Sequence, residues 1–311
     1  MYLFRLIRWP NLIIVVLTQY LLYQFVLVHH LESVGISPLL LISDFIALTM
    51  ATVCTAAAGY IVNDIFDQVI DALNKPEKMV IGKLLSERVA WWWYGGFIAL
   101  GLSGIIYLTI RTGYWFWIPG YVAANAMMFA YSWKWKKEVL IGNFVVALFC
   151  AMVAIVVGVG ETDVLQGLLP EHEGVYEKII MVFVGYAIFA FLSTMYREIV
   201  KDMEDVKGDE VNHCRTLPIA IGIQKAKSVA AFFAISLFLC SVYWAYLLFT
   251  SEQYPHLIYL IGGIILPIKF SLLLLGKAET KAAFHQLSTL TKLIMLGGIL
   301  YLVLEAFLER V

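Results

Sequence analysis

Apolar residues occur along this chain in long runs that short polar links separate. Nine of the runs have the length of about 20 residues that a helix needs to cross a bilayer. They lie at 10–28, 44–62, 89–110, 114–132, 139–159, 178–197, 228–249, 257–275 and 291–308. The pattern predicts an all-α, polytopic membrane protein with nine transmembrane helices. Because no linker or soluble segment interrupts the runs, we expect residues 1–311 to form a single domain.

The composition supports this interpretation. Hydrophobic residues make up 61% of the chain and charged residues only 14%, a balance far from that of soluble domains. The net charge of -1 gives no reason to expect a nucleic-acid partner, and nothing in the sequence indicates a required protein partner. The four cysteines have no metal-binding spacing, so we interpret them as packing residues.

The charges of the links predict the orientation in the membrane. Basic or mixed links alternate with neutral or acidic ones, and the most acidic link is 160–177. Since basic links remain on the cytosolic side, we expect the N-terminus inside and the C-terminus outside. Arg5 and Arg8 precede the first run without a signal cleavage site, so we interpret that run as a span of the cell membrane.

Two aspartate clusters stand at the ends of the second and sixth runs. The first, NDIFDQVIDALNKP, contains Asp64, Asp67 and Asp71. The second, YREIVKDMEDVKGDE, repeats the steps of three and four residues with Asp202, Asp205 and Asp209. On a helix these steps place three carboxylates on one face. Both clusters end even-numbered runs, so we expect both on the cytosolic side of the membrane.

A row of like charges is unfavourable unless a cation neutralises it. A solvated acidic helix end is the simplest alternative for one cluster, but two clusters with matched spacing favour a functional site. Carboxylate ligands without His or Cys suit Mg²⁺, which binds through a few carboxylates together with substrate phosphates. The sequence therefore predicts Mg²⁺ and a polyphosphate between the two rows.

Basic and aromatic residues near the clusters are candidates for binding the substrate. Lys134, Arg197 and Lys201 lie at span ends and are the preferred ligands of the phosphates, although cytosolic Lys and Arg also set topology whatever the function. With these three cations, Tyr131 is a candidate catalytic residue. The further candidates for binding the substrate are Lys75, Lys78, Lys136, Lys137, Asn143, Tyr196 and Arg215. His213 lies beyond the second cluster, and we interpret it as an exposed loop residue.

The two clusters resemble the two aspartate-rich motifs of the UbiA superfamily of intramembrane prenyltransferases. The nine predicted helices and the segment from Tyr131 to Asn143 agree with this resemblance. The resemblance implies a helical bundle around a central cavity, with Mg²⁺ as the cofactor and an isoprenyl diphosphate as the substrate. It implies that the metal ligands are Asn63, Asp64, Asp67, Asp71, Asp202, Asp205 and Asp209. After Asn74-Lys75-Pro76 this chain departs from the usual Arg-Pro of the family and has Glu77-Lys78.

The segment REIVKDMEDVKGDEVNHCRTLPIAIG is most similar to the branch with the geranylgeranylglycerol-phosphate geranylgeranyltransferases and the chlorophyll synthases. The resemblance implies transfer of a geranylgeranyl group to geranylgeranylglycerol phosphate, a lipophilic acceptor, among the membrane lipids. Arg8, Asn11 and Lys78 are then candidates for holding the acceptor's phosphate, although Arg8 could instead be a topological anchor. Within the class, an aromatic or tetrapyrrole acceptor is the alternative. Outside it, the alternative is an ion-coupled transporter, which predicts inverted repeats and mid-bilayer charges.

Overall fold

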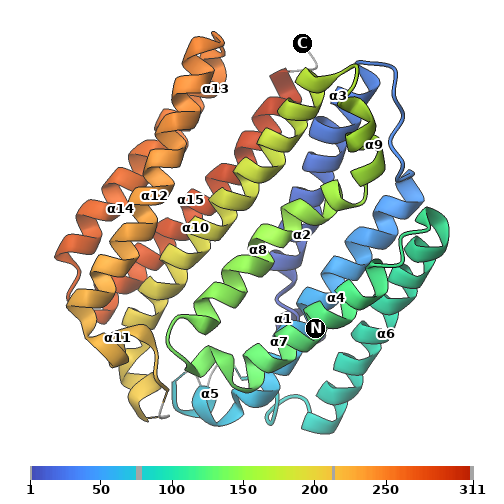
Figure 1. Ribbon diagram of the computed structural model, residues 1–311. Coiled ribbons are helices and arrows are strands. Elements are labelled where there is room, and N and C mark those ends of the chain that lie inside the picture. Colours follow the sequence, from blue (N-terminus) through green and yellow to red (C-terminus); the bar gives the residue numbers. More distant parts are fainter. Residues whose placement is uncertain (1, 75–78, 212–213, 309–311) are drawn as a thin grey trace. The chain divides into compact units, whose positions relative to one another are not determined.

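The protein is all-helical over the residues that its computed structural model describes, 2–74, 79–211 and 214–308 (Figure 1). Among them, eight helical segments are long and apolar enough to cross a membrane. The segments are Trp9–Glu32, Ile42–Phe66 (α4), Glu87–Thr112 (α6), Ile141–Val159 (α8), Glu173–Val211 (α10), Ile223–Thr250 (α12), Tyr254–Lys277 and Lys281–Leu308 (α15). Each contains or largely overlaps one of the predicted runs, so the membrane class is confirmed.

The remaining predicted run, 114–132, forms α7 (Trp117–Trp133). Its 17 residues lie at the short end of the range of roughly 17–25 that spans a bilayer. The count of nine spans therefore stays a prediction.

Two spans contain a π-helical segment that the apolar pattern does not predict. The first consists of α2 (Trp9–Leu21), the π-helix η1 (Leu22–Val28) and α3 (His29–Glu32). The seventh consists of α13 (Tyr254–Leu260), the π-helix η4 (Ile261–Ile265) and α14 (Leu266–Lys277). Short helices complete the fold: α1 (Tyr2–Leu6), α5 (Gln68–Asn74), the 3-10 turn η3 (Trp135–Lys137), α9 (Thr162–Leu168) and α11 (Leu217–Ile221).

The helices divide into two compact units. The first comprises residues 1–136 and 156–179, and the second comprises 137–155 and 180–311. Both α8 and α10 pass from one unit into the other along the chain. The prediction of a single domain over 1–311 stays a prediction.

Small residues bring α4 and α6 close together in the first unit. A Cβ atom added at Gly104 would lie 3.0 Å from the carbonyl oxygen of Ala47, and one added at Gly101 would lie 3.0 Å from Cβ of Cys54. Such close approach is how helices pack where lipid removes the hydrophobic driving force between them. It fixes the first half of α4, the helix whose opposite end carries the first aspartate cluster.

A buried carboxylate joins two distant segments of the first unit. Glu161 is fully buried, and its two carboxylate oxygens accept hydrogen bonds from the backbone N–H groups of Leu39 (2.7 Å) and Leu40 (2.8 Å). The Tyr23 hydroxyl donates to the Leu40 carbonyl at 2.5 Å. Burial raises the pKa of Glu161, although the two backbone hydrogen bonds oppose the shift. Glu161 thus fixes the segment that leads into α4.

We expect Glu161→Gln to lower the stability of the protein. An amide has one acceptor oxygen, so its NH₂ group would face one of the two backbone donors and leave that donor unpaired. A buried unpaired donor costs about 1–3 kcal/mol. The thermal midpoint of the purified protein measures the effect, and the exposed Glu171→Gln in the same link is the control. An unchanged midpoint for Glu161→Gln would contradict this role.

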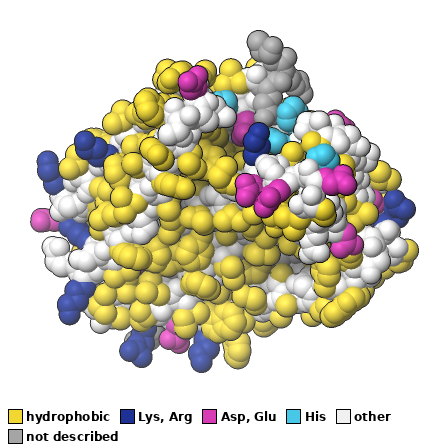
Figure 2. Space-filling model, turned by 45° about the horizontal axis from the view of Figure 1, so that its top comes forward, with side chains coloured by type: hydrophobic (Ala, Val, Ile, Leu, Met, Phe, Trp, Pro, Cys, Tyr) yellow, Lys and Arg dark blue, Asp and Glu magenta, His cyan; other side chains and the backbone are white. Residues whose placement is uncertain are grey.

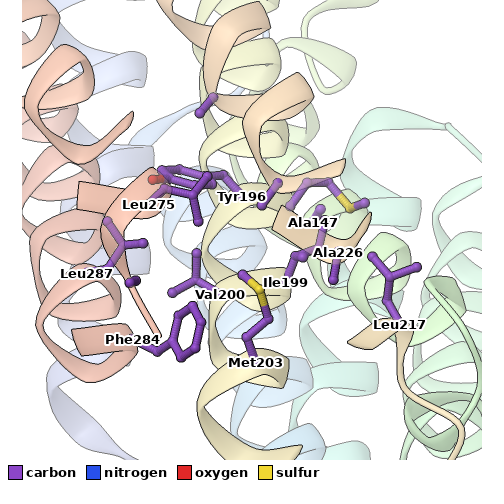
Figure 3. Close-up of a cluster of buried hydrophobic side chains, with 14 residues drawn as sticks. Ala147, Tyr196, Ile199, Val200, Met203, Leu217, Ala226, Leu275, Phe284 and Leu287 are labelled. Carbon is purple, nitrogen blue, oxygen red and sulfur yellow. The ribbon is translucent and has the colours of Figure 1, made fainter. Parts of the chain in front are cut away.

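The second unit has its own apolar core around α10 (Figure 3). Tyr196, Ile199, Val200 and Met203 of α10 are buried there, together with Phe284 of α15. These positions recur at helical spacing, so one side of α10 is held in the core. The remaining side of the same turns carries Arg197, Glu198, Lys201 and Asp202.

Large apolar side chains cover much of the face shown in Figure 2. Over the described residues as a whole, the exposed large apolar side chains include Trp92, Ile110, Phe232, Ile258 and Leu273. A soluble surface rarely exposes such a continuous apolar area, whereas lipid requires it. The surface is therefore that of an integral membrane protein.

Candidate functional site

The first aspartate cluster lies at the junction of α4 and α5. Helix α4 ends at Phe66, and its C-cap residue Asp67 has φ -92° and ψ 1°. The backbone hydrogen bonds nevertheless continue, from the Asp67 N–H to Asn63 O (3.0 Å) and from the Asp71 N–H to Asp67 O (2.8 Å). The sequence had predicted one uninterrupted helix for this row of carboxylates. In the structure the row instead crosses the junction of two helical segments, α4 and α5, at Asp67.

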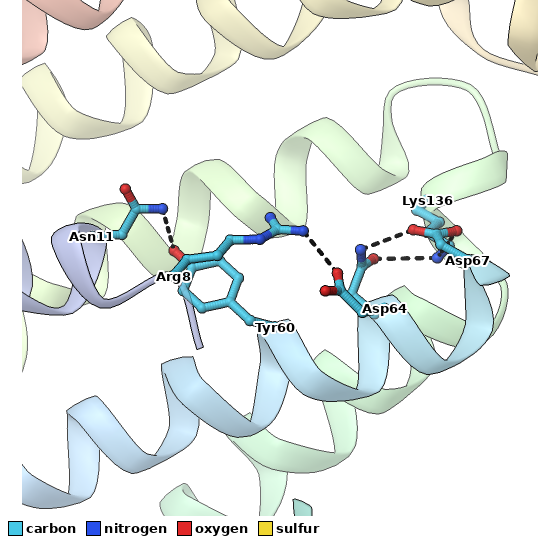
Figure 4. Close-up of polar contacts among 7 residues, drawn as sticks. Arg8, Asn11, Tyr60, Asp64, Asp67 and Lys136 are labelled. Atoms are coloured by element: carbon cyan, nitrogen blue, oxygen red, sulfur yellow. Dashed lines mark hydrogen bonds and ion pairs between the residues drawn. The ribbon is translucent and has the colours of Figure 1, made fainter. Parts of the chain in front are cut away.

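An asparagine and a lysine hold the carboxylate of Asp67. The Asn63 amide donates to Asp67 Oδ2 at 2.8 Å, and Lys136 Nζ contacts Asp67 Oδ1 at 2.5 Å (Figure 4). Lys136 Nζ also donates to Asn63 Oδ1 at 3.2 Å. The Lys136 and Asp67 side chains are only 11% and 16% exposed, so the ion pair is shielded from solvent.

The sequence had favoured Lys134 over Lys136. In the structure Lys134 is the exposed C-cap of α7, whereas Lys136 lies in the 3-10 turn η3 that follows. Three lysines within four residues look equivalent in the sequence, because the turn alone decides which one points toward Asp67. A role for Lys134 stays a prediction.

Arg8 contacts the first cluster from the joint between α1 and α2. Its Nη2 lies 2.9 Å from Asp64 Oδ1, and its guanidinium carbon lies 4.8 Å from the centre of the Tyr60 ring (Figure 4). The Asn11 amide donates to the Tyr60 hydroxyl at 3.1 Å. Arg8 and Asn11, predicted to hold the acceptor, are thus linked to the first motif through Tyr60 and Asp64.

The backbone of Arg8 is in the left-handed region, with φ 51° and ψ 52°. This conformation is uncommon for a residue with a side chain and costs of order 1 kcal/mol, so the surrounding contacts must hold it. Burial acts to lower the pKa of Arg8, but the Asp64 carboxylate and the Tyr60 ring outweigh it and the pKa is raised. The strained joint therefore presents a permanently charged guanidinium to Asp64.

The second aspartate cluster lies on one continuous helix. Helix α10 runs from Glu173 to Val211, so Asp202, Asp205 and Asp209 share a face, as predicted. The amide of Asn143, near the start of α8, donates to Asp202 Oδ2 at 2.8 Å. Asn143 was predicted to bind substrate; its side chain contacts a candidate metal ligand, just as Asn63 contacts Asp67.

Cations precede the second cluster on α10. Arg197 Nη1 forms a short ion pair with Glu198 Oε1, and Lys201 Nζ lies 3.6 Å from Glu198 Oε2. Arg197 Nε is buried and has no acceptor among the described residues. Glu198 was not singled out in the sequence, although its position one turn before Asp202 was visible there.

The remaining predicted residues lie in different surroundings. Tyr196 is 1% exposed and packs in the apolar core of the second unit, while Tyr131 is half-buried near the end of α7. Arg215 is exposed, and its backbone N–H donates to the Lys137 carbonyl at 2.8 Å. Lys75, Lys78 and His213 lie outside the described residues.

The oxygen donors fit Mg²⁺ bound together with phosphate. Among the described residues, no three His, Cys, Asp or Glu side chains converge to enclose an ion. Mg²⁺ does not need such a cage, because it binds through one or two carboxylates, waters and substrate phosphates. Asn63, Asp64 and Asp67 on α4, and Asp202 and Asp205 on α10, have the right donor chemistry, and cations beside them could hold the phosphates.

Fold and site together define a class: a polytopic helical membrane protein whose span ends combine carboxylates with cations for a phosphorylated ligand. The chain belongs to the UbiA prenyltransferase family, whose family model matches residues 21–292. The resemblance inferred from the two motifs is thereby confirmed. We therefore set aside the ion-coupled transporter.

Relatives of known name support the same family. A digeranylgeranylglyceryl phosphate synthase of Thermococcus gammatolerans is 34% identical over 185 residues, which are 60% of this chain and 59% of the relative. One of Sulfurisphaera tokodaii is 30% identical over 232 residues, 73% of each chain. The chain thus spans about three-fifths of the length of the first of these relatives.

Solved structures share the fold. A digeranylgeranylglyceryl phosphate synthase structure superimposes with a TM-score of 0.69 at 23% identity, covering 98% of this chain and 97% of the other. A UbiA homologue of Archaeoglobus fulgidus, bound to DMAPP and Mg²⁺, superimposes with a TM-score of 0.55 at 14% identity, covering 97% and 99%. The predicted UbiA-type helical fold is confirmed.

Proposed function

We propose that this protein transfers a prenyl group, geranylgeranyl, from its diphosphate to geranylgeranylglycerol phosphate in the synthesis of membrane ether lipids. The observation that carries the proposal is the shielded ion pair of Asp67 with Lys136 at the first motif, together with the cations Arg197 and Lys201 that precede the second motif. Membership in the prenyltransferase family and the names of its relatives support it.

The residues suggest how the reaction proceeds. Mg²⁺ bound by the aspartates would polarise the diphosphate and offset its charge. Lys136, Arg197 and Lys201 would neutralise the charge that develops on the leaving diphosphate as the allylic C–O bond breaks. The diphosphate leaves with the bonding electron pair, the acceptor hydroxyl oxygen forms the new bond to carbon, and its proton passes to solvent.

The carbocation-like carbon needs a dry, aromatic environment until the acceptor attacks. Water would quench it, whereas the face of an aromatic ring stabilises a cation. Tyr131, half-buried near the end of α7, is our candidate for this face. Tyr196 is more deeply buried, so we propose that it shapes the apolar pocket.

We propose that the site lies on the cytosolic side of the cell membrane, with the N-terminus inside and the C-terminus outside. The support is the distribution of charge: the link with Lys134, Lys136 and Lys137 is basic, and Lys136 contacts Asp67 of the first motif, whereas the 160–177 link is acidic.

Product analysis tests the proposal directly. The purified protein is incubated with geranylgeranyl diphosphate, Mg²⁺ and a panel of acceptors, and the products are identified by mass spectrometry. We expect digeranylgeranylglyceryl phosphate, and no product when Mg²⁺ is removed with a chelator. A product formed only from an aromatic or tetrapyrrole acceptor would support the alternative within the family.

Arg8 is our candidate for the acceptor's phosphate. It lines a surface recess together with Phe4, Arg5, Trp9 and Pro10, so cationic and apolar groups meet there, as a phosphorylated lipid requires. We propose that Arg8 leaves Asp64 for the acceptor phosphate when Mg²⁺ takes over the neutralisation of Asp64. Lys78 stays a predicted second ligand.

We expect Arg8→Ala to raise KM for the phosphorylated acceptor by tenfold to a hundredfold. A charge-assisted contact of about 1.5–3 kcal/mol corresponds to that loss. KM for the prenyl diphosphate should change little, and Arg88→Ala, at an exposed arginine outside this recess, is the matched control. Equal KM values of the unmodified enzyme for phosphorylated and dephosphorylated acceptor would contradict this assignment before any variant is made.

A further inference from the structure

A single carboxylate lies between the two cations that precede the second motif. Both oxygens of Glu198 are engaged, Oε1 with Arg197 Nη1 and Oε2 with Lys201 Nζ at 3.6 Å. The side chain of Glu198 is 15% exposed, compared with 19% for Arg197 and 39% for Lys201. The carboxylate is thus the least exposed of the three charged groups.

The group has an excess of positive charge. Arg197 and Lys201 share Glu198, and Lys292 of α15 lies within electrostatic range of all three side chains. Asp202 is a second carboxylate within range of Glu198 and Lys201, which leaves three cations to two carboxylates. The buried Arg197 Nε has no acceptor among the described residues. A buried charged donor without an acceptor is unfavourable, and an anionic ligand would supply the missing oxygen.

The negative charge of Glu198 weakens the binding of an anionic ligand to Arg197 and Lys201, because like charges repel. If affinity for diphosphate were the only requirement, a neutral residue at position 198 would serve better, because it would leave the cations uncompensated. An enzyme gains no rate from cations that bind the ground state and the leaving product as tightly as the transition state. A fixed carboxylate beside the cations weakens the binding of the ground-state substrate and of the leaving diphosphate, and it keeps the cations in position.

We propose that Glu198 is a positioning residue that holds Arg197 and Lys201 at the second motif and limits the affinity of this site for diphosphate. The inference rests on the proposed function, since it takes diphosphate as the anion that these cations bind. The alternative is an ordinary ion pair within one helix turn, which contributes to helix stability and has no effect on ligand affinity.

Binding of inorganic diphosphate separates the two roles. The full chain in nanodiscs is titrated with diphosphate in the presence of Mg²⁺ by calorimetry. We expect Glu198→Gln to bind diphosphate roughly tenfold more tightly, because a unit charge a few ångströms from the ligand is removed. In turnover, product inhibition by diphosphate should strengthen by the same factor and kcat should fall. Glu210→Gln, at the exposed end of the same helix, is the matched control.

Two further variants make the test robust. Glu198→Met has a neutral side chain of similar length and should also bind diphosphate more tightly, which serves if Glu198→Gln does not fold. Glu198→Asp keeps the charge and should bind with nearly the affinity of the unmodified protein. If the folded Glu198→Gln or Glu198→Met variant bound diphosphate with unchanged or weaker affinity and had a lowered thermal midpoint, this inference would be overturned. The proposed function would not be affected by that result. If the unmodified protein bound no diphosphate with Mg²⁺, the proposed function would fail and the inference with it.

Discussion

Asp205→Asn is expected to lower kcat at least about a thousandfold while the protein remains folded. Asparagine keeps the size of the side chain but removes the charge, and loss of a ligand should exceed the roughly tenfold to hundredfold effect of losing a residue that only orients one. Because Asp205 stands among like charges on one helix face, its neutralisation should leave stability equal or slightly raised.

Turnover with geranylgeranyl diphosphate and the thermal midpoint measure the two effects for Asp205→Asn. Glu210→Asn is the control, since Glu210 is exposed on α10 outside the aspartate row. Full activity in Asp205→Asn would exclude a metal-binding role for this carboxylate. A large drop in the midpoint would instead indicate a structural role.

The same substitution at Asp67 is expected to differ in one respect. The sequence predicts unchanged or raised stability at both positions, because both aspartates stand in a repulsive row. In the structure Asp67 neutralises the shielded Lys136, whereas asparagine would place a neutral amide oxygen beside that cation. Loss of this shielded ion pair costs at least about 1–3 kcal/mol, so we expect the substitution at Asp67 to lower the thermal midpoint as well as kcat.

Lys136→Met is expected to lower kcat with the prenyl diphosphate by about 10²–10³-fold. Methionine keeps the apolar stem but removes the charge, and loss of one preorganised group that stabilises developing charge has an effect of that size. Mg²⁺ binding should persist, because the carboxylates of the first motif remain. Single-turnover kinetics at saturating substrate and Mg²⁺ measure the chemical step.

Lys134→Met is the matched control for Lys136→Met, with the same chemical change two residues earlier. Lys134 is exposed at the C-cap of α7, so we expect its replacement to change kcat by no more than a few-fold. If Lys134→Met had the larger effect, the contact of Lys136 with Asp67 would be structural, and the role first predicted for Lys134 would be supported.

The pairing of amides with carboxylates recurs at both motifs. Asn63 donates to Asp67 Oδ2, and Asn143 donates to Asp202 Oδ2, each at 2.8 Å. A hydrogen bond to one oxygen fixes the orientation of a carboxylate. Each amide therefore orients one aspartate of its motif.

The sequence by itself determined the class of protein, the positions of the spans and the chemistry of the two motifs. A helix that crosses a bilayer needs about 20 consecutive apolar residues. Each span can therefore be recognised from its own stretch of sequence, without the tertiary structure. The aspartate spacing is equally local: α10 continues unbroken through Asp202, Asp205 and Asp209, as the steps of three and four predict. Carboxylate chemistry then suggests Mg²⁺ without any knowledge of packing.

The tertiary structure alone decided which side chains meet across the chain. Lys136 rather than Lys134 contacts Asp67, Arg8 contacts Asp64 from 56 residues away, and Glu161 binds the backbone at Leu39 and Leu40. Local periodicity says which face of a helix is apolar, but not how a turn such as η3 rotates three adjacent lysines. A left-handed residue such as Arg8 is likewise held by contacts with distant groups, because its own local preference opposes that conformation.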